Sequence, residues 1–279
     1  NQIWRRRFLT WGIFIAVFGM RLLLPLILAS ILLSISPVHA LRIAVGDPQK
    51  FSAIMHSAHV SISAFGGAYL LMVSLKYFFE KNRSTFWLEK IERPLSYLGR
   101  VESLKVVITL ILIYCISLIQ NEANTLGFIT AGLWGTITFI TVDGIAEFLN
   151  APNSDKTAIN ATKKNLSLFL YLEMLDASFS FDGVIGAFAI TNNLFIIMIG
   201  LGIGAIFVRS ITILFVNTGT MKKYPFLKHG AFYAIGALSI IMFINTIMHV
   251  SDVITALVGI FFIGAAIISS IRYQRVKSR

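Results

Sequence analysis

Eight long apolar runs, separated by short polar joins, dominate the pattern of hydrophobic and polar positions along the chain. Most of these runs are long enough for a helix that crosses a bilayer, which takes about 20 residues at a rise of about 1.5 Å per residue. The runs fall at residues 8–35, 51–79, 104–119, 126–149, 166–190, 194–216, 231–249 and 252–271. The pattern predicts an all-α polytopic membrane protein with about eight transmembrane helices.

The composition agrees with a membrane protein and excludes an ordinary soluble domain. Hydrophobic residues make up 56% of the chain and charged residues only 13%, whereas soluble domains carry about 25% charged residues. The single cysteine, Cys115, lies in an apolar run and excludes a disulfide framework. The five histidines show no spacing typical of a zinc site.

The Lys and Arg residues predict an orientation for the eight runs. If the runs alternate in direction, the N-terminus, the segments 76–105, 150–165 and 217–229, and the C-terminus share one side, which holds twenty basic residues. The opposite side holds only Arg42 and Lys50. Basic loops remain on the cytoplasmic side, so we expect both ends of the chain in the cytoplasm and the helices in a bacterial inner membrane. We interpret the net charge of +11 as this signal and not as a nucleic-acid interface.

Two pairs of segments indicate an internal repeat. "GIFIAVFGMRLLLPLIL" (12–28) is similar to "GLGIGAIFVRSITILFV" (200–216) at an offset of 188 residues. "HVSISAFGGAYLLM" (59–72) is similar to "HGAFYAIGALSIIM" (229–242) at an offset of 170. Both matches occur in the same order along the chain, which favours duplication.

The repeat predicts a division of the chain into residues 1–120, the remainder of a first membrane repeat, and residues 121–279, the second repeat. The acidic run 166–190 precedes the second copy of the pattern, and its counterpart would lie before residue 1. We therefore expect the chain to begin inside a longer protein. About five spans per repeat, an odd number, makes the repeats inverted, an architecture that binds its substrate near the midplane of the membrane.

Carboxylates inside the apolar runs are the candidate chemistry. An ionised carboxylate at the centre of a bilayer costs roughly 2.5–3.5 kcal/mol on the translocon scale. The candidate residues are Asp143 and Glu147 in the fourth run, with Glu173, Asp176, Ser180 and Asp182 in the fifth. Only two arginines lie within the runs to balance these five acids. For the three acids of the fifth run a functional role is favoured over a structural one, whereas for Asp143 and Glu147 both roles stay open.

The spacing of the fifth-run acids predicts a broken helix. Nine residues separate Glu173 from Asp182, which places them on opposite faces of a straight helix. The stretch "SFDGVIG" combines Ser, Asp and two glycines, so we expect an irregular helix between Ser180 and Gly183. A broken span exposes backbone carbonyls that can bind a cation. Carboxylate, hydroxyl and carbonyl oxygens suit Mn²⁺, Mg²⁺ or Ca²⁺ better than Cu or Zn.

The residues 173–211, "EMLDASFSFDGVIGAFAITNNLFIIMIGLGIGAIFVRSI", followed by "FLKHGAFYAIGALSIIMFI", resemble the second half of the TerC family of integral membrane proteins, in its larger uncharacterised-domain branch. Residues 12–79 resemble the end of that family's first half. The resemblance implies a fold of the LysE-like exporters and a link to manganese export and tellurium resistance. By the resemblance, Glu173, Asp176 and Asp182 match the family's second acidic motif. Asn192 or Asn193 stands where many members have Asp, and Gly183 where many have Ser.

Three functions follow as hypotheses. The first is a transporter that exports a divalent metal ion, Mn²⁺ foremost, and needs no cofactor. The second is an intramembrane aspartyl protease that uses Asp143 and Asp182, because two Asp-Gly pairs lie on consecutive runs. The third is a membrane scaffold for a metal or tellurium stress-response complex. The Gly-x-Gly-Asp pattern of the protease class is missing, and so are nucleotide-binding, HExxH and GxSxG motifs, so we expect no enzyme. His59 and His229 are expected to cap or pack at helix starts.

Overall fold

The structure, a computed structural model, describes most of the chain outside its first 34 residues and the region around 151–192. The described residues are 19, 23, 26, 27, 30, 35–80, 85–99, 101, 103–150, 187, 191, 193–218 and 223–277. These residues form helices and connecting turns, and no strand occurs among them. The expected all-α fold is therefore confirmed for the described part of the chain.

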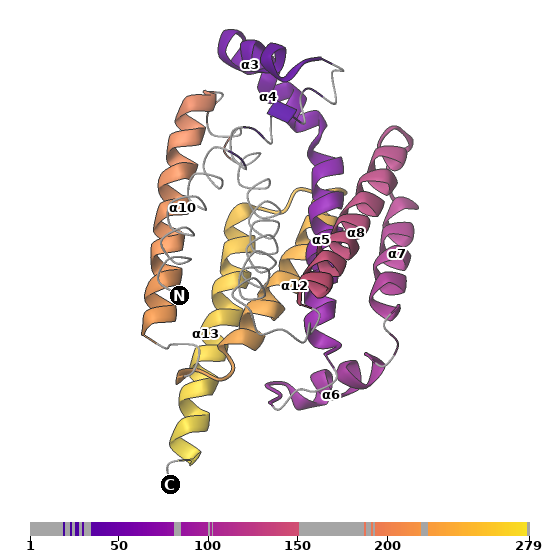
Figure 1. Cartoon of the computed structure of the whole chain (residues 1–279). Helices are drawn as coiled ribbons and strands as arrows, with labels where there is room; N and C mark the ends of the chain where they lie inside the picture. Colours follow the sequence, from indigo (N-terminus) through magenta and orange to yellow (C-terminus); the bar gives the residue numbers. More distant parts are fainter. Residues whose placement is uncertain are drawn as a thin grey trace. The chain divides into compact units, whose positions relative to one another are not determined.

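The helices of the described residues follow the apolar runs closely (Figure 1). Their bounds are α3 (Pro37–Gly46), α4 (Pro48–Ser57), α5 (His59–Phe78), α6 (Glu89–Leu98), α7 (Leu104–Ser117), α8 (Glu122–Asn150), α10 (Leu194–Asn217), α12 (Leu227–Asn245) and α13 (Asp252–Lys277). Among the described residues, four segments are long and apolar enough to cross a membrane: His59–Phe78, Glu122–Phe148, Leu227–Asn245 and Asp252–Arg275. Two shorter apolar stretches are Leu104–Ser117 and Phe195–Val208. The runs 8–35 and 166–190 lie almost wholly outside the described residues, and the prediction of eight spans stays a prediction.

One predicted boundary is wrong, because the run 51–79 is not a single helix. It divides at Ala58 into the end of α4 and the whole of α5. α4 also begins upstream of the predicted run, where Asp47 caps it by accepting a hydrogen bond from the backbone N–H of Lys50 at 3.1 Å. Ser36 caps α3 in the same way, and both helices place a proline in their first turn. The segment before α5 is therefore a pair of short helices and not a loop.

The chain divides into two compact units that share helices. One unit comprises residues 1–62 and 138–212, and the other comprises residues 63–137 and 213–279. In the first unit, a small core joins α3 and α4 to α10: Ala40, Ala44, Phe51 and Met55 are buried together with Ile197.

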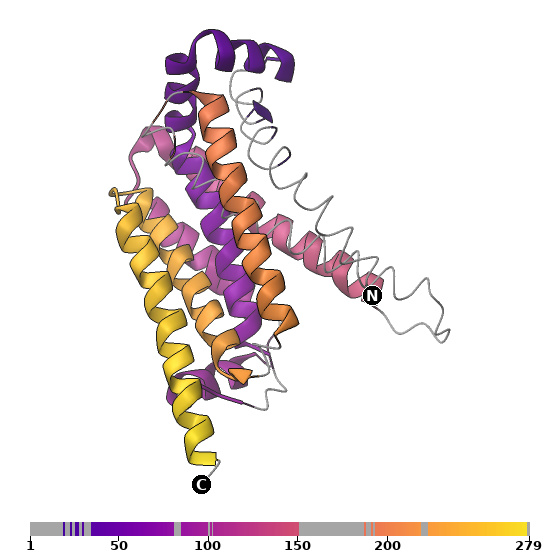
Figure 2. The same cartoon turned by 90° about the vertical axis from the view of Figure 1, so that its left-hand side faces the viewer.

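The second unit is built around α5, whose residues Ala68, Tyr69, Leu70 and Met72 are fully buried. α12 packs antiparallel to α5, because the Ser74 hydroxyl donates to the Phe232 carbonyl at 3.1 Å and the Ser239 hydroxyl to the Gly67 carbonyl at 2.8 Å. α13 runs beside α12, as Figures 1 and 2 show from two sides. Hydroxyl-to-carbonyl bonds of this kind and small residues join helices in membranes, where burial of apolar surface adds little.

Glycines bring the helices of the second unit to backbone contact. A Cβ added at Gly135 of α8 would lie 2.3 Å from the Phe65 carbonyl oxygen of α5. A Cβ at Gly230 of α12 would lie 2.5 Å from the Ala266 Cβ of α13. No other residue type fits either position without moving a neighbouring helix, which explains these glycines by packing alone.

The basic residues gather at one end of the second unit. The end of α5, α6, the start of α12 and the end of α13 meet there: Glu92 contacts His229, Phe226 packs on Tyr273, and the Gln274 amide donates to the Lys223 carbonyl. At the opposite end the Gln120 amide donates to the Thr246 hydroxyl at 2.6 Å. The described segments at that opposite end, 118–125 and 246–252, hold no Lys or Arg. Within this unit, the described basic residues of α6, of the start of α12 and of the end of α13 therefore lie at the same end.

A Gly135→Ala variant should separate α8 from α5 and lower the stability of the detergent-solubilised protein. Overpacking of this kind costs typically about 1–3 kcal/mol, which a lower midpoint temperature of thermal unfolding would report. Gly259→Ala in α13 is the matched control, because nothing lies within 4 Å of a Cβ at Gly259. The control should keep or raise stability, since Ala favours a helix over Gly. Equal midpoints for the two variants would contradict the close contact at Gly135.

Candidate functional site

Two of the six predicted site residues lie in the described part of the chain, near the C-terminal end of α8. Asp143 is buried, with 6% of its surface exposed. Glu147 follows one helical turn later and is exposed. The i, i+4 spacing therefore makes these two acids neighbours on the helix, but their surroundings differ. Of the two, Asp143 is the stronger candidate for a binding role.

The other predicted site residues lie outside the described residues. These residues are Glu173, Asp176, Ser180 and Asp182. The expected irregular helix between Ser180 and Gly183 lies in the same region, so both remain predictions. Among the residues that the structure does describe, no three His, Cys, Asp or Glu side chains lie close enough together to hold a metal ion. A metal site that includes Asp143 would therefore need the acids of the fifth run.

The structure adds a buried acid–imidazole pair that the sequence reading did not predict. Glu92 of α6 has 0% of its surface exposed and His229 of α12 has 3%. The His229 Nδ1 atom lies 3.0 Å from the Glu92 Oε2 atom and 3.2 Å from Oε1. The backbone N–H groups of Trp87 and Leu88 also donate to the Glu92 carboxylate, at 3.2 and 3.4 Å. The carboxylate thus receives donors both from the start of its own helix and from α12.

Aromatic rings enclose this pair. Tyr77 stacks on Phe232 with ring centres 3.8 Å apart and 5° between the planes. The edges of Tyr77 and Phe226 approach the His229 ring, with centroid distances of 5.7 and 6.1 Å. Lys228 Nζ lies 5.1 Å from the centre of the Tyr77 ring, within the range of a cation–π contact. The enclosure keeps water from the pair and strengthens its hydrogen bonds.

The pair fastens α6 to the bundle. A buried carboxylate is costly unless several donors satisfy it, and Glu92 gains the His229 donor only when α6 packs against the start of α12. The expectation that His229 packs near a helix start is confirmed: it is the third residue of α12 and is buried. The partner was not predictable, because 137 residues separate Glu92 from His229. The one sequence signal was the position of Glu92 on a short amphipathic segment.

Comparisons with known proteins return one family. A protein-family model described as "Protein of unknown function (DUF475)" matches residues 1–277. No curated protein and no solved structure matches the chain. The match covers nearly the whole chain, including both compact units.

A Glu92→Ala variant should destabilise the packing of α6 against α12. It removes the acceptor of two backbone N–H groups and of a buried imidazole, and loss of one member of such a pair costs about 3 kcal/mol or more. The expected result is a lower unfolding midpoint in detergent and faster tryptic cleavage after Lys90. Glu89→Ala is the control in the same helix, because Glu89 is exposed and forms only a surface ion pair with Arg93. An equal response of the two variants would refute the anchoring role of Glu92.

Proposed function

The chain belongs to the DUF475 family of proteins of unknown function, and we propose that it is a membrane transporter that exports a divalent metal ion, with Mn²⁺ as the first candidate. The proposed substrate site is made of carboxylates inside the membrane. Its members are Asp143, Glu147, Glu173, Asp176 and Asp182, with the Ser180 hydroxyl as a further ligand. Such a site can exchange a metal ion for protons, which suits antiport.

The burial of Asp143 carries the proposal. α8 contains a segment, Glu122–Phe148, that is long and apolar enough to cross a membrane, and Asp143 is buried within it. A carboxylate inside a membrane span faces the interior of a bundle or a cavity, and such residues mark ion pathways more often than they support structure. The three acids of the run 166–190 add to the same excess of negative charge, and a bound cation would balance it. The resemblance to the TerC family favours a metal ion over other cations.

The packing of α5 on α12 supports the inverted repeat that the transport proposal needs. These two helices carry the repeated "H…A…G…M" pattern, and they run antiparallel. When a two-fold axis in the membrane plane relates two helices, residues at equivalent positions of the two repeats lie opposite each other where the helices cross. Ser239 corresponds to Tyr69 at the offset of 170 residues, and it bonds Gly67, two residues from that position. This register is compatible with the proposed inverted repeats and supports them.

The distribution of charge supports an orientation. The basic end of the second unit is the proposed cytoplasmic end, since Lys and Arg are retained on that side of a membrane. Both ends of the chain would then be cytoplasmic, in a bacterial inner membrane. Export would start from this end of the bundle.

Cysteine labelling tests the orientation. In a Cys115→Ser background, an impermeant maleimide applied to whole cells should label Gly46→Cys, because residue 46 is exposed at the end of α3 on the proposed outer side. It should fail to label Lys223→Cys, an exposed position at the basic end, until the cells are opened. The reverse pattern would invert the topology and remove the argument for export.

Substitution of the buried acids tests the transport site. Asp143→Asn and Asp176→Asn each keep the size of the side chain and remove its charge, so each should abolish Mn²⁺ resistance while the membrane level of the protein holds or rises. Glu122→Gln is the matched control, because it changes an exposed acid in the first turn of α8. Cellular Mn, Ca, Mg and Zn contents should be measured for each variant. Metal export at the wild-type rate by both Asn variants would refute the carboxylate site.

A further inference from the structure

We propose that α6 is an interfacial helix that binds the anionic phospholipid surface of the membrane. The inference concerns the basic end of the second unit, and it does not depend on the proposed transport. α6 lies between α5, which ends at Phe78, and α7, which begins at Leu104. α5 is apolar enough to cross a membrane and α7 is a shorter apolar helix, so the segment that joins them lies at the boundary of hydrocarbon and water. Figure 1 shows α6 across this end of the unit.

One face of α6 is fixed against the unit. Glu92 holds it to α12 through His229. One turn further along, the Ser96 hydroxyl donates to the Glu80 carbonyl at 3.0 Å. Gly99, directly after the helix, lies so close to the end of α5 that a Cβ would be 1.9 Å from the Phe79 carbonyl oxygen. These three contacts lie along one side of α6, so the opposite side of the helix faces away from the unit.

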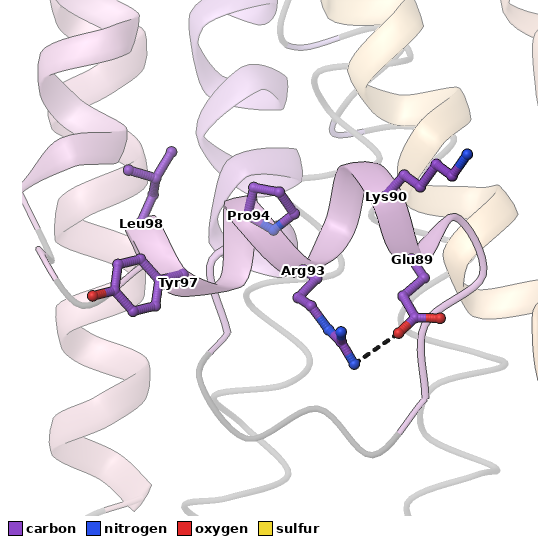
Figure 3. A pocket seen from close by; sticks show the side chains of 6 residues that line it. All are labelled: Glu89, Lys90, Arg93, Pro94, Tyr97 and Leu98. Carbon is purple, nitrogen blue, oxygen red and sulfur yellow. Dashed lines mark ion pairs between the residues drawn. The ribbon is translucent and has the colours of Figure 1, made fainter.

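The outward side of α6 combines apolar and charged residues. Ile91, Tyr97 and Leu98 are 50%, 63% and 49% exposed. Figure 3 shows Leu98 and Pro94 pointing to one side of the helix and the paired charges of Glu89 and Arg93 to the other. An open groove follows this surface, lined by Glu89, Lys90, Arg93, Pro94, Tyr97 and Leu98. A helix with one apolar and one charged edge is typical of segments that lie in the plane of the membrane surface.

The backbone restricts how deep this helix can lie. Pro94 has no N–H group and cannot donate to the Lys90 carbonyl, its partner in a regular helix. A carbonyl without its helical donor is costly in the hydrocarbon core, but water and lipid headgroups can donate to it. Tyr97 agrees with this depth, since Tyr is enriched where the bilayer meets water. The headgroup layer is therefore the position that suits both edges of α6.

The charge around α6 indicates which class of lipid headgroup it binds. The segment 76–105 holds seven Lys and Arg residues against four Glu residues. Of these acids, Glu92 is buried with His229 and Glu89 is paired with Arg93 at 2.7 Å. By its sequence the segment therefore carries an excess of positive charge. Basic side chains near an anionic bilayer gain about 1 kcal/mol each, about a fivefold preference, so an anionic headgroup is the matching partner.

Site-directed spin labels in the whole chain test this position. With Cys115→Ser, a label at Leu98→Cys is compared with a label at Glu89→Cys after reconstitution into phosphatidylcholine vesicles with and without phosphatidylglycerol. We expect the label at position 98 to collide with lipid-soluble oxygen and to be shielded from a water-soluble nickel chelate, while the label at position 89 remains open to nickel. The shielding should be stronger with phosphatidylglycerol.

A double variant separates the role of charge from that of the apolar edge. The double variant Lys90→Gln with Arg93→Gln is measured in the phosphatidylglycerol vesicles. It should lower the ratio of label in the lipid to label in water at position 98 by about thirtyfold. The reason is that each lost charge removes about 1 kcal/mol of attraction to the anionic bilayer. Without phosphatidylglycerol the double variant should have no effect. Arg42→Gln with Lys50→Gln, which removes two exposed charges from α3 and α4, should leave the ratio unchanged.

Three outcomes would overturn the proposal. Equal nickel access at positions 98 and 89 would place α6 in water. Shielding from both nickel and oxygen would show that a protein surface covers the helix. Equal shielding of position 98 in the two vesicle types would show that anionic headgroups are not its partner.

Discussion

Backbone-to-backbone approach of helices around α5 is the constraint on which the rest of the second unit depends. Inside a bilayer, lipid tails solvate apolar side chains as well as neighbouring helices do, so helices associate through close packing and a few hydrogen bonds. α5 supplies both kinds of contact. The Phe65 carbonyl meets Gly135 of α8, and the Gly67 carbonyl accepts from Ser239 of α12. The positions of α8 and α12 follow from these contacts, and α12 in turn places His229 over α6.

The buried Glu92–His229 pair shows how a polar contact can define an arrangement that apolar packing leaves open. α6 carries exposed apolar residues on its outer side, so hydrophobic burial alone does not select the face that turns inward. A carboxylate that needs a further donor does select it, because only one rotation of the helix brings Glu92 to His229. The specificity of the contact thus matters more than its net strength, which desolvation reduces.

Much of the architecture was predictable from the sequence, because a membrane imposes a strong pattern. The longer helices follow the apolar runs, whereas α3 and α6 lie between them, and the described Lys and Arg residues of α6, the start of α12 and the end of α13 lie at one end of the second unit. The division between α4 and α5 was missed, although Asp47 and Pro48 carry a readable helix-start signal. Apolar content averaged over the whole run does not detect such a division, although the polar residues His56, Ser57, His59 and Ser61 flank Ala58.

The candidate site was predictable in part. The burial of Asp143 and the exposure of Glu147 could not be separated by their spacing, because residues four apart share a helix face and only the neighbouring helices distinguish them. Glu92 was missed for a different reason. Its partner is 137 residues away, and no local pattern in a single sequence reports a contact between segments so far apart.

The hydrogen bond between Ser74 and Phe232 spans 158 residues of the chain, and this separation bears on how the protein is made. At a synthesis rate of about 5–20 residues per second, α12 emerges roughly 8–30 s after α5. During that interval the glycine and serine surface of α5 has no partner but lipid, so α5 must persist in the bilayer through its own hydrophobicity. The second unit can therefore assemble only after α12, in the last third of the chain, has been synthesised. The rate of translation thus limits how soon α5 and α12 can pack together.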